Sequence, residues 1–407
     1  MTTKLATGLS SGKDSAAVAT EAVLQAKKKL GENRVDLSIV YSSNLYDHSV
    51  VIDAVRKATN NAPLIGASTT GEFTEERIEK GSIAVGLLFS NGIKVFTAMA
   101  QGVKQDPETA IREVVANLPS NLDGYPHSTA ILLIDGLSGA GEEATLLASY
   151  FLGRELKIVG GMAGDDFKMK KTFVFSNDKV YTNALSVCLL ASKTPLFTSV
   201  KHGHIPLGRT LKATRTKGNV LYEINDRPAW ELWKEETAEV ARKRGIDVER
   251  IKTPADIAQF FTNYMLGLAT EKEGQYKIRW PMGINEDGSL NFTCGITEGT
   301  IFRIMDGSNL EKQIGAAEKA VMIAKQSAEN AGYSKFAGIL VFDCAAKQLM
   351  LGDIFSKSVD RFKKVLPGVP LLGWETYGEI RLEPGQFSGF HNTSSVVLLL
   401  PKKDDTV

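Results

Sequence analysis

The sequence is poor in the residues that disulfide scaffolds, metal centres and membrane spans require. It has three cysteines, an odd number without metal-type spacing, and five histidines in 407 residues. Its longest apolar runs, 184–191 and 395–400, are strand-sized and well short of the roughly 18 residues that a membrane helix needs. Residues 1–30 lack the apolar core of a secretion signal. We therefore expect a cytoplasmic protein with reduced thiols and no membrane span.

The sequence also lacks an excess of charge of either sign. It has 48 basic and 47 acidic residues, which gives a net charge of +1. Nucleic-acid-binding proteins usually carry a basic excess or a basic stripe, so nucleic acid is not expected as the partner. Hydrophobic residues make up 43% and charged residues 23%, as in ordinary globular proteins. The length is sufficient for two domains, each with its own core.

One ten-residue phrase, an apolar strand followed by a glycine turn with an acid, occurs three times. It reads PLIGASTTGE at 63–72, KIVGGMAGDD at 157–166 and PLLGWETYGE at 370–379. The first and third copies share Pro, Leu, Gly, Thr, Gly and Glu at matching positions. Internal self-similarity of this kind predicts a fold built from repeated units. We call these segments the first, second and third glycine phrases.

The residues around each phrase predict a unit of helix, strand, helix, strand, glycine turn and strand. The expected helices are 15–30, 49–59, 107–118, 142–152, 310–331 and 354–366. The expected strands outside the phrases are 35–41, 82–89, 129–135, 185–191, 338–343 and 395–400. Alternating strands and helices favour parallel β-α-β crossovers, and the following β-rich stretches favour antiparallel hairpins. Mixed sheets are therefore expected.

A different segment, 218–307, separates the second unit from the third. It predicts helices at 229–242 and 255–268 and strands at 276–279 and 289–293. The basic stretch 207–218 before it resembles a connection between halves. We therefore predict an α/β fold of two domains, with mixed β-sheets flanked by helices. The predicted domains are 1–210, with two repeat units, and 211–407, with the inserted segment 218–307 and the third unit 310–400.

The glycine turns are candidates for binding a ligand, because ligands sit beyond the carboxyl ends of parallel strands. Glycine can adopt positive φ and lets a ligand approach the backbone, and the acid can accept its hydrogen bonds. Alternatively, the glycines only turn the chain and the acids cap it. Neighbouring strand ends are marked by Ser42, Asp135 and Asp343. The predicted ligand-binding residues are Gly66, Thr70, Gly71, Glu72, Gly161, Gly164, Asp165, Asp166, Asp343, Cys344, Thr376, Gly378, Glu379, His391 and Asn392.

The segment 10–15 (SSGKDS) follows a predicted strand at 4–8 and opens a helix. This is the context of the pyrophosphate loop of ATP pyrophosphatases, at a helix N-terminus. The alternative is a capping box, with Ser11 as N-cap and Asp14 three residues later. An ATP-using or hydrolytic enzyme that acts through this loop is therefore kept as an alternative function.

The histidines leave a second alternative open. His202 and His204 lie on the same side of a predicted strand and could ligate a metal or haem iron. The ordinary alternative is a polar surface pair. His391 lies just before the last strand, where a loop could fold over the pocket mouth or hold the histidine in a structural hydrogen bond. Cys344 is expected to be a small core residue unless its setting is electropositive.

Together these segments resemble the FIST family, a sensory family with an N-terminal and a C-terminal FIST domain. The N-terminal resemblance rests on GASTTGE at 66–72 and GGMAGDD at 160–166. The C-terminal resemblance rests on EINDRPA at 223–229, FDC at 342–344, TYGEI at 376–380 and FHN at 390–392. Two residues depart from the family pattern. Asp226 replaces a glycine, and Lys347 stands where arginine is more frequent.

The resemblance implies a non-catalytic signal-input module that binds a small molecule, with amino-acid-like ligands expected. No kinase, methyl-accepting or cyclic-nucleotide domain is recognisable, so we expect it to act through a partner protein. Some bacterial members are similar to nitric-oxide-sensing haem proteins that regulate a histidine kinase. On that alternative, haem b would be held by His202, His204 or His391. The pocket is predicted where the glycine turns of the two halves converge.

Overall fold

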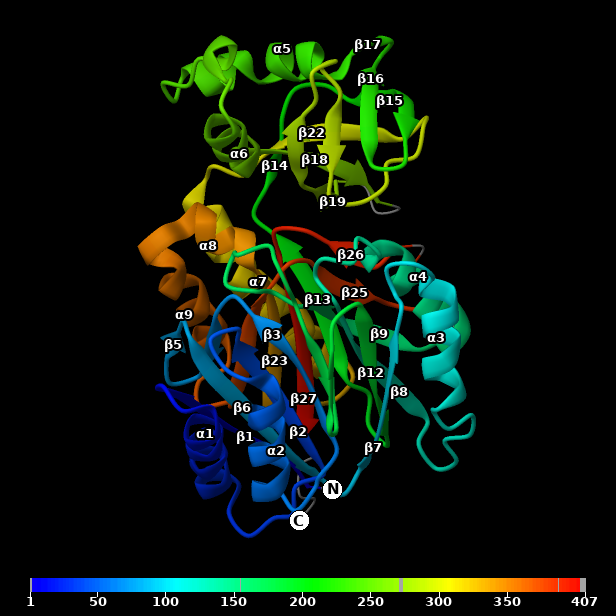
Figure 1. Ribbon diagram of the computed structural model, residues 1–407, viewed down its shortest axis with the longest axis vertical. Helices are drawn as coiled ribbons and strands as arrows, with labels where there is room; N and C mark the ends of the chain where they lie inside the picture. Colours follow the sequence, from blue (N-terminus) through cyan, green and yellow to red (C-terminus); the bar gives the residue numbers. More distant parts are fainter. Residues whose placement is uncertain (1, 154, 271–273, 387, 403–407) are drawn as a thin grey trace.

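The computed structural model describes residues 2–153, 155–270, 274–386 and 388–402. These residues form a mixed α/β fold with four sheets (Figure 1). Three sheets form a body, made of the described residues of 2–204 and 307–402. The fourth forms a smaller upper unit, made of the described residues of 205–306. The predicted α/β class with mixed sheets is therefore confirmed.

The three sheets of the body share one pattern, in which antiparallel strands flank a parallel pair. The first runs β1 (Thr3–Ser11), β6 (Ser82–Ser90), β2 (Leu37–Ser43), β3 (Leu64–Thr69), β10 (Val174–Ser176), β11 (Lys179–Tyr181). The second runs β7 (Ile93–Gln101), β12 (Ala184–Ser192), β8 (His127–Ile134), β9 (Lys157–Met162), β25 (Glu379–Leu382), β26 (Phe390–His391). The third runs β13 (Phe197–His202), β27 (Ser394–Lys402), β23 (Lys335–Cys344), β24 (Leu371–Thr376), β4 (Glu72–Thr74), β5 (Ile78–Glu79). In each sheet the third and fourth strands are the parallel pair.

The last two strands of each sheet come from a segment that follows the glycine phrase of another sheet. β4 follows β3 along the chain but pairs with β24. β10 follows β9 but pairs with β3, and β25 follows β24 but pairs with β9. Each sheet therefore receives its last two strands from the segment after another sheet's phrase, in a closed cycle of three sheets. This exchange brings the strands that end in the three glycine phrases to a common place in the fold.

Helices cover one face of each body sheet, and the opposite faces share one core. The covering helices are α1 (Ser15–Leu30), α2 (His48–Ala58), α3 (Pro107–Ala116), α4 (Gly141–Leu152), α7 (Leu310–Asn330), α8 (Ala345–Leu351) and α9 (Phe355–Val365). The shared core joins apolar side chains of all three sheets, among them Tyr41, Leu133 and Trp374. Burial of such side chains stabilises each by about 1.5–3 kcal/mol.

Local sequence signals explain where these helices begin. Asp14, Asp106 and Asn309 each accept a hydrogen bond from the backbone N–H three residues later. Asp47 caps α2 in a similar way. The predicted N-cap at Ser11 is wrong, because Ser11 is the last residue of β1 and Asp14 is the N-cap of α1.

The upper unit has one sheet and two helices. Its strands are β14 (Ile205–Pro206), β15 (Leu211–Lys217), β16 (Val220–Ile224), β17 (Arg227–Pro228), β18 (Tyr264–Ala269), β19 (Tyr276–Arg279), β20 (Pro281–Ile284), β21 (Leu290–Phe292) and β22 (Ile301–Asp306). Its helices are α5 (Ala229–Arg242) and α6 (Pro254–Asn263). The predicted helix 255–268 is wrong beyond Asn263, because the apolar run from Tyr264 pairs with β19 and β22 as strand β18. A short apolar run fits helix and strand equally well until pairing decides.

The predicted boundary at 210/211 lies in the upper unit, directly before β15. Strands from both sides of this boundary join in the third sheet, where β13 pairs with β27. The predicted third unit, 310–400, lies in the body beside the first two. Among the helices of the described chain, none combines the length and the apolar character that a membrane crossing requires.

Candidate functional site

The three glycine phrases meet, as the sequence predicted for the two halves, and each is hydrogen-bonded to both of the others. The bonds run from Gly164 N to Ser68 O (2.9 Å), from Glu375 N to Gly71 O (2.9 Å) and from Tyr377 N to Met162 O (3.0 Å). A further bond joins Met162 N to Gly378 O at 2.8 Å. Backbone groups of segments far apart in the sequence therefore satisfy one another at this junction.

The glycines of the phrases allow this contact between chain segments. A Cβ atom on Gly71 would lie 2.5 Å from Glu375 Oε1, and one on Gly161 would lie 2.7 Å from Thr376 Cγ2. Gly71, Gly164 and Gly378 do not have positive φ, so the expected left-handed turn is wrong at these positions. The group that approaches each glycine here is another part of the protein, rather than a ligand.

Glu72 and Glu379 make matching hydrogen bonds inside the protein. Glu379 accepts from Thr376 Oγ1 at 2.8 Å and from the Ser394 backbone and hydroxyl at 2.9 and 2.8 Å. Glu72 accepts from Thr69 Oγ1 and, at 3.3 and 2.6 Å, from the backbone and hydroxyl of Ser82. Both carboxyl groups are buried, and burial raises the pKa of each to about 8. The acids of the first and third phrases thus bind their own turn and the neighbouring strand.

These buried carboxyl groups predict a stability that falls as pH rises. Between the usual pKa of 4.5 and the folded value of about 8, the folded protein holds a proton that the unfolded chain has released. Stability from each group is fully present below pH 4.5 and is lost through pH 8, by up to about 1.4 kcal/mol per pH unit. Glu379→Gln keeps a neutral amide there, so we expect a shallower pH dependence in urea unfolding than for the parent protein.

The exposed Glu311 provides the control for this experiment. Its side chain is 74% exposed, so Glu311→Gln should leave the slope of stability against pH unchanged. Equal slopes for the parent protein and Glu379→Gln would show that the Glu379 carboxyl is already ionised in the folded state.

The second phrase differs from the other two in the position of its acids. Glu72 is the first residue of β4 and pairs with Trp374, and Glu379 is the first residue of β25 and pairs with Gly161. The equivalent first residue of β10 is Val174, which pairs with Ala67. The expected recurrence of an acid in all three copies is therefore wrong for this position. Asp165 and Asp166 belong instead to a longer turn between β9 and β10.

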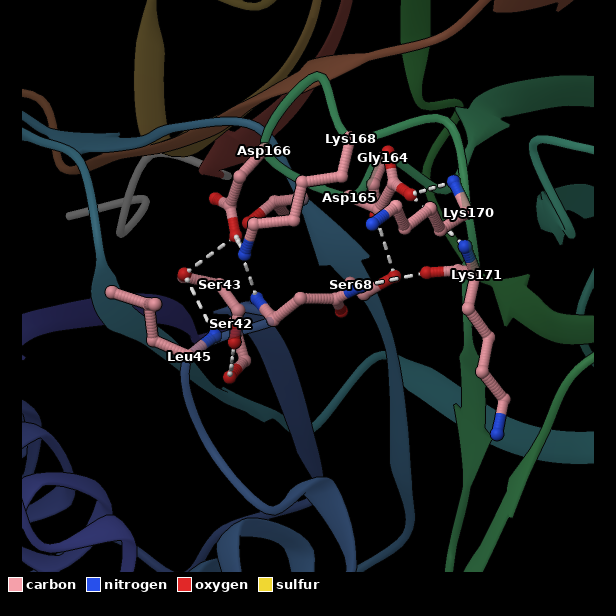
Figure 2. Close-up of polar contacts among 12 residues, drawn as sticks. Ser42, Ser43, Leu45, Ser68, Gly164, Asp165, Asp166, Lys168, Lys170 and Lys171 are labelled. Carbon is pink, nitrogen blue, oxygen red and sulfur yellow. Dashed lines mark hydrogen bonds and ion pairs between the residues drawn. The ribbon is translucent and has the colours of Figure 1, made fainter.

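Asp165 and Asp166 hold this longer turn in place (Figure 2). Asp165 accepts hydrogen bonds from the backbone N–H groups of Met169, Lys170 and Lys171 at 2.9, 2.6 and 3.0 Å. It also accepts one from the Tyr377 hydroxyl of the third phrase at 2.6 Å. The turn contains positive φ at Asp166 (55°), Phe167 (60°) and Met169 (52°). Such conformations persist only where surrounding contacts enforce them.

A cavity of about 480 Å³ lies beside this turn, between the body and the upper unit. We call it the interdomain cavity. Its lining residues are Gly136, Leu137, Gly139, Gly141, Met162, Phe167, Met169, Asn219, Trp280, Met282, Asn291, Phe292, Thr293, Cys344, Ala345, Ala346, Leu349, Thr376, Tyr377, Phe390 and Asn392. The second and third phrases, the carboxyl end of β23 and the upper unit all contribute to it.

The lining of the interdomain cavity is mainly apolar and aromatic, and none of the described residues that line it is charged. Burial and the neighbouring Glu379 raise the pKa of the Cys344 thiol well above its usual range. Burial and Asp165 raise the pKa of the Tyr377 phenol. Both groups are therefore neutral, and the polar groups on offer are amides, hydroxyls, a thiol and backbone atoms. Such a lining suits a ligand with an apolar or aromatic body and uncharged polar groups.

Asn392 connects the two sides of this cavity. Its Oδ1 accepts hydrogen bonds from Trp280 N at 3.3 Å and from Thr293 Oγ1 at 3.0 Å. Both donors belong to the upper unit, whereas Asn392 lies in the body beside β26. A ligand in the cavity would therefore contact both sides of the junction.

The predicted site residues separate into three groups in the structure. Cys344, Thr376 and Asn392 line the interdomain cavity. Asp165 and His391 each line a different cavity. The others do not line the interdomain cavity and lie in or beside the interlocked phrases: Gly66, Thr70, Gly71, Glu72, Gly161, Gly164, Asp166, Asp343, Gly378 and Glu379.

The sequence reasoning missed most of the residues that line this cavity. The glycine-rich loop 136–141 follows the strand end marked by Asp135, so the rule of carboxyl strand ends could have found it. Trp280, Met282 and Phe292 had no such signal, because they reach the cavity only through the packing of the upper unit on the body.

The candidate haem ligands His202, His204 and His391 line one further cavity together. His202 Nε2 lies 3.0 Å from Tyr276 O, and its Nδ1 accepts from His204 N at 3.2 Å. His391 Nε2 lies 3.2 Å from Arg381 O. No group of three or more metal-binding side chains gathers within the described parts of the chain. The bond of His391 fits its structural alternative. The polar surface pair expected for His202 and His204 is wrong, because His204 is buried and His202 is partly buried.

Comparison with known proteins gives two family matches. A model of the FIST N domain matches residues 36–227, and a model of the FIST C domain matches residues 238–381. The uncharacterised protein MJ1623 of Methanocaldococcus jannaschii is 25% identical over 264 residues, which is 60% of this chain. The chain spans about half (49%) of that relative's length.

A solved structure of cyanuric acid hydrolase from A. caulinodans aligns with 99% of this chain and 100% of its own, at 6% identity and a TM-score of 0.36. A similarity this low supports no conclusion about fold or activity.

Proposed function

Because this chain belongs to the FIST family, with a FIST N and a FIST C domain, we propose that it is a non-catalytic sensor whose ligand binds in the interdomain cavity. FIST domains are sensory and signalling domains. The single observation that carries the proposal is an uncharged cavity lined from both the body and the upper unit. A ligand bound there acts on the junction between them.

The lining of the cavity favours an uncharged ligand with an aromatic or apolar body. A free amino acid carries an ammonium and a carboxylate, and no charged residue in the described lining would compensate either. The amino-acid-like ligand expected from the family resemblance is therefore replaced here by an uncharged molecule. Three exposed apolar side chains lie at the cavity: Met169, Met282 and Leu349 are 54%, 54% and 57% exposed. Methionine side chains adapt readily to ligands of different shape.

The signal in this proposal is a change in how the upper unit sits on the body. A ligand that binds one arrangement better shifts the population toward it, by its difference in affinity for the two states. A partner signalling protein, such as a histidine kinase, would read this change. We also infer that the three body sheets are copies of one repeated unit, because they share a strand pattern and glycine phrases. The hydrogen bonds of the histidines give no support to the haem alternative.

A thermal-shift screen of uncharged aromatic and apolar metabolites tests the proposal, since a ligand that binds only the folded state raises its stability. Met282→Asp and Leu349→Asp place a charge at the cavity, and both positions are exposed, so folding should be retained. Each change should weaken a ligand from the screen at least about tenfold, because the ligand would bury an unpaired carboxylate.

Met322→Asp is the matched control, because Met322 is 52% exposed on α7 and does not line this cavity. It should bind the ligand normally. Unchanged binding in both cavity variants would place the ligand site elsewhere.

A further inference from the structure

A second and larger cavity, of about 820 Å³, lies beneath the upper unit on the side of α7. We call it the cationic cavity. It is bounded by β13, the exposed face of α7, the β18–β19 hairpin and the turn between β25 and β26. Its charged lining residues are Lys157, Lys201, Lys277, Lys319, Arg381 and Glu383.

Positive charge predominates in this cavity. Glu383 is the acidic residue among its described lining, and it is paired with Arg381 at 2.8 Å. Lys157 donates to the Leu196 carbonyl at 2.9 Å, a neutral partner that leaves its charge uncompensated. Glu271, Lys272 and Glu273, which connect β18 to β19, lie outside the described residues.

Two of the lysines are available to a ligand. Neither Lys201 nor Lys319 makes a hydrogen bond or ion pair to another part of the described chain. Lys201 lies on β13 and Lys319 on α7, two elements that pack against each other. The same positive field acts on buried His391, because burial and the charges of Lys277, Arg279 and Arg381 hold its pKa well below the usual range. An anion in the cavity would relieve this repulsion.

Uncharged groups that could complete an anion site also line the cavity. Thr198, Gln275, Gln386 and Ser327 bring hydroxyl and amide groups from four different segments. The volume lies in the range of about 300–1,000 Å³ that is usual for small-molecule sites. Lysine and arginine side chains are the usual protein partners of phosphate and carboxylate groups.

We propose that the cationic cavity binds a small polyanion, a metabolite that carries several phosphate or carboxylate groups. Lys201 of β13 and Lys319 of α7 contact its charged groups. Lys157 adds positive potential, whereas the charge of Arg381 is compensated by Glu383. The site does not depend on the function proposed for the interdomain cavity, because the two cavities are lined by different residues.

The two cavities nevertheless share a wall. Along β26 and the next residue, Phe390 and Asn392 line the interdomain cavity, whereas His391 lines the cationic cavity. Side chains alternate in this way along extended chain. Lys277 of β19 lines the cationic cavity, and Trp280, directly after β19, lines the interdomain cavity. The anion site therefore lies where it can sense the same junction.

Isothermal titration of the full chain with pyrophosphate, ATP and citrate at low ionic strength tests the site and distinguishes phosphate from carboxylate ligands. We expect saturable binding of at least one of these anions. Lys201→Ala/Lys319→Ala should weaken it at least about tenfold, because charge-assisted hydrogen bonds carry such recognition. Lys28→Ala/Lys104→Ala removes the same charge from exposed positions elsewhere and should bind as the parent protein does.

Three results would overturn the site. The first is the absence of saturable binding for all three anions. The second is equal weakening in both double variants, which would indicate a general charge effect. The third is loss of binding in Lys13→Ala with normal binding in Lys201→Ala/Lys319→Ala, which would place the anion at segment 10–15. Thermal melting checks the fold, and the exposed Lys319→Ala alone replaces the double variant if that variant is unfolded.

Discussion

Replacement of Lys347 by methionine is expected to lower the free energy of unfolding by about 3–5 kcal/mol, because it leaves a buried carboxylate without its counter-charge. The side chains of Lys347 and Asp343 are both 0% exposed. Lys347 Nζ lies 2.8 and 3.1 Å from the two Asp343 oxygens. It also donates to Ser395 Oγ at 2.7 Å, so one side chain joins α8 to the ends of β23 and β27.

Urea unfolding of the variant and of two controls measures this effect. Lys347→Met/Asp343→Leu removes both charges and should recover most of the loss, since an apolar pair of similar volume replaces a buried ion pair at little cost. Lys243→Met breaks the exposed pair with Glu239 and should cost less than about 1 kcal/mol. A loss as small as this for Lys347→Met would show that the buried pair contributes no more than an exposed one.

Replacement of Arg279 by methionine is expected to loosen the upper unit from the body and to cost about 3 kcal/mol, because a buried guanidinium is lost together with its bonds across the junction. Arg279 is fully buried at the end of β19. Its Nη2 donates to Glu142 Oε1 of α4 at 2.6 Å, and its Nη1 donates to Phe390 O of β26 at 3.0 Å. Asn392 and Lys277 make further hydrogen bonds between the two parts.

Calorimetry and limited proteolysis test this prediction together. In Arg279→Met we expect the upper unit to unfold at a lower temperature than the body and to be cleaved faster. Arg209→Met is the matched control, because Arg209 is exposed and pairs with Glu236 within the upper unit. It should change the stability by less than about 1 kcal/mol. A single unshifted transition in Arg279→Met would mean that the remaining contacts, such as those of Asn392, hold the junction without Arg279.

The buried Asp343–Lys347 pair and the buried Arg279 side chain clarify the chemistry of the interdomain cavity. Asp343 precedes the lining residue Cys344, and Arg279 precedes the lining residue Trp280. Both charges turn away from the cavity and are neutralised inside the protein. The cavity wall is thereby held by strong polar contacts, while its inner surface remains uncharged. Charged residues therefore stand next to this lining in the sequence without contributing to it.

Local signals in the sequence were sufficient for most of the described helices but for fewer than half of the described strands. The predicted helix 15–30 and strand 276–279 have the bounds found for α1 and β19. Helix caps, apolar periodicity and the placement of glycine depend on residues close together in the sequence. A single sequence therefore shows them without knowledge of the packing. The segment from Tyr264 forms strand β18 because it pairs with β22, which is distant in the sequence. The helix predicted for this segment was therefore wrong.

The sequence by itself determined the mixed α/β class, the three glycine phrases and membership of the FIST family. Only the tertiary structure decided what those phrases do. Because each phrase is followed by strands that join another sheet, the three turns interlock, and the acids Glu72 and Glu379 are satisfied inside the protein. The cavities form afterwards, where the upper unit covers these turns. Their lining comes from segments that meet only through strand exchange and domain packing, which no local pattern encodes.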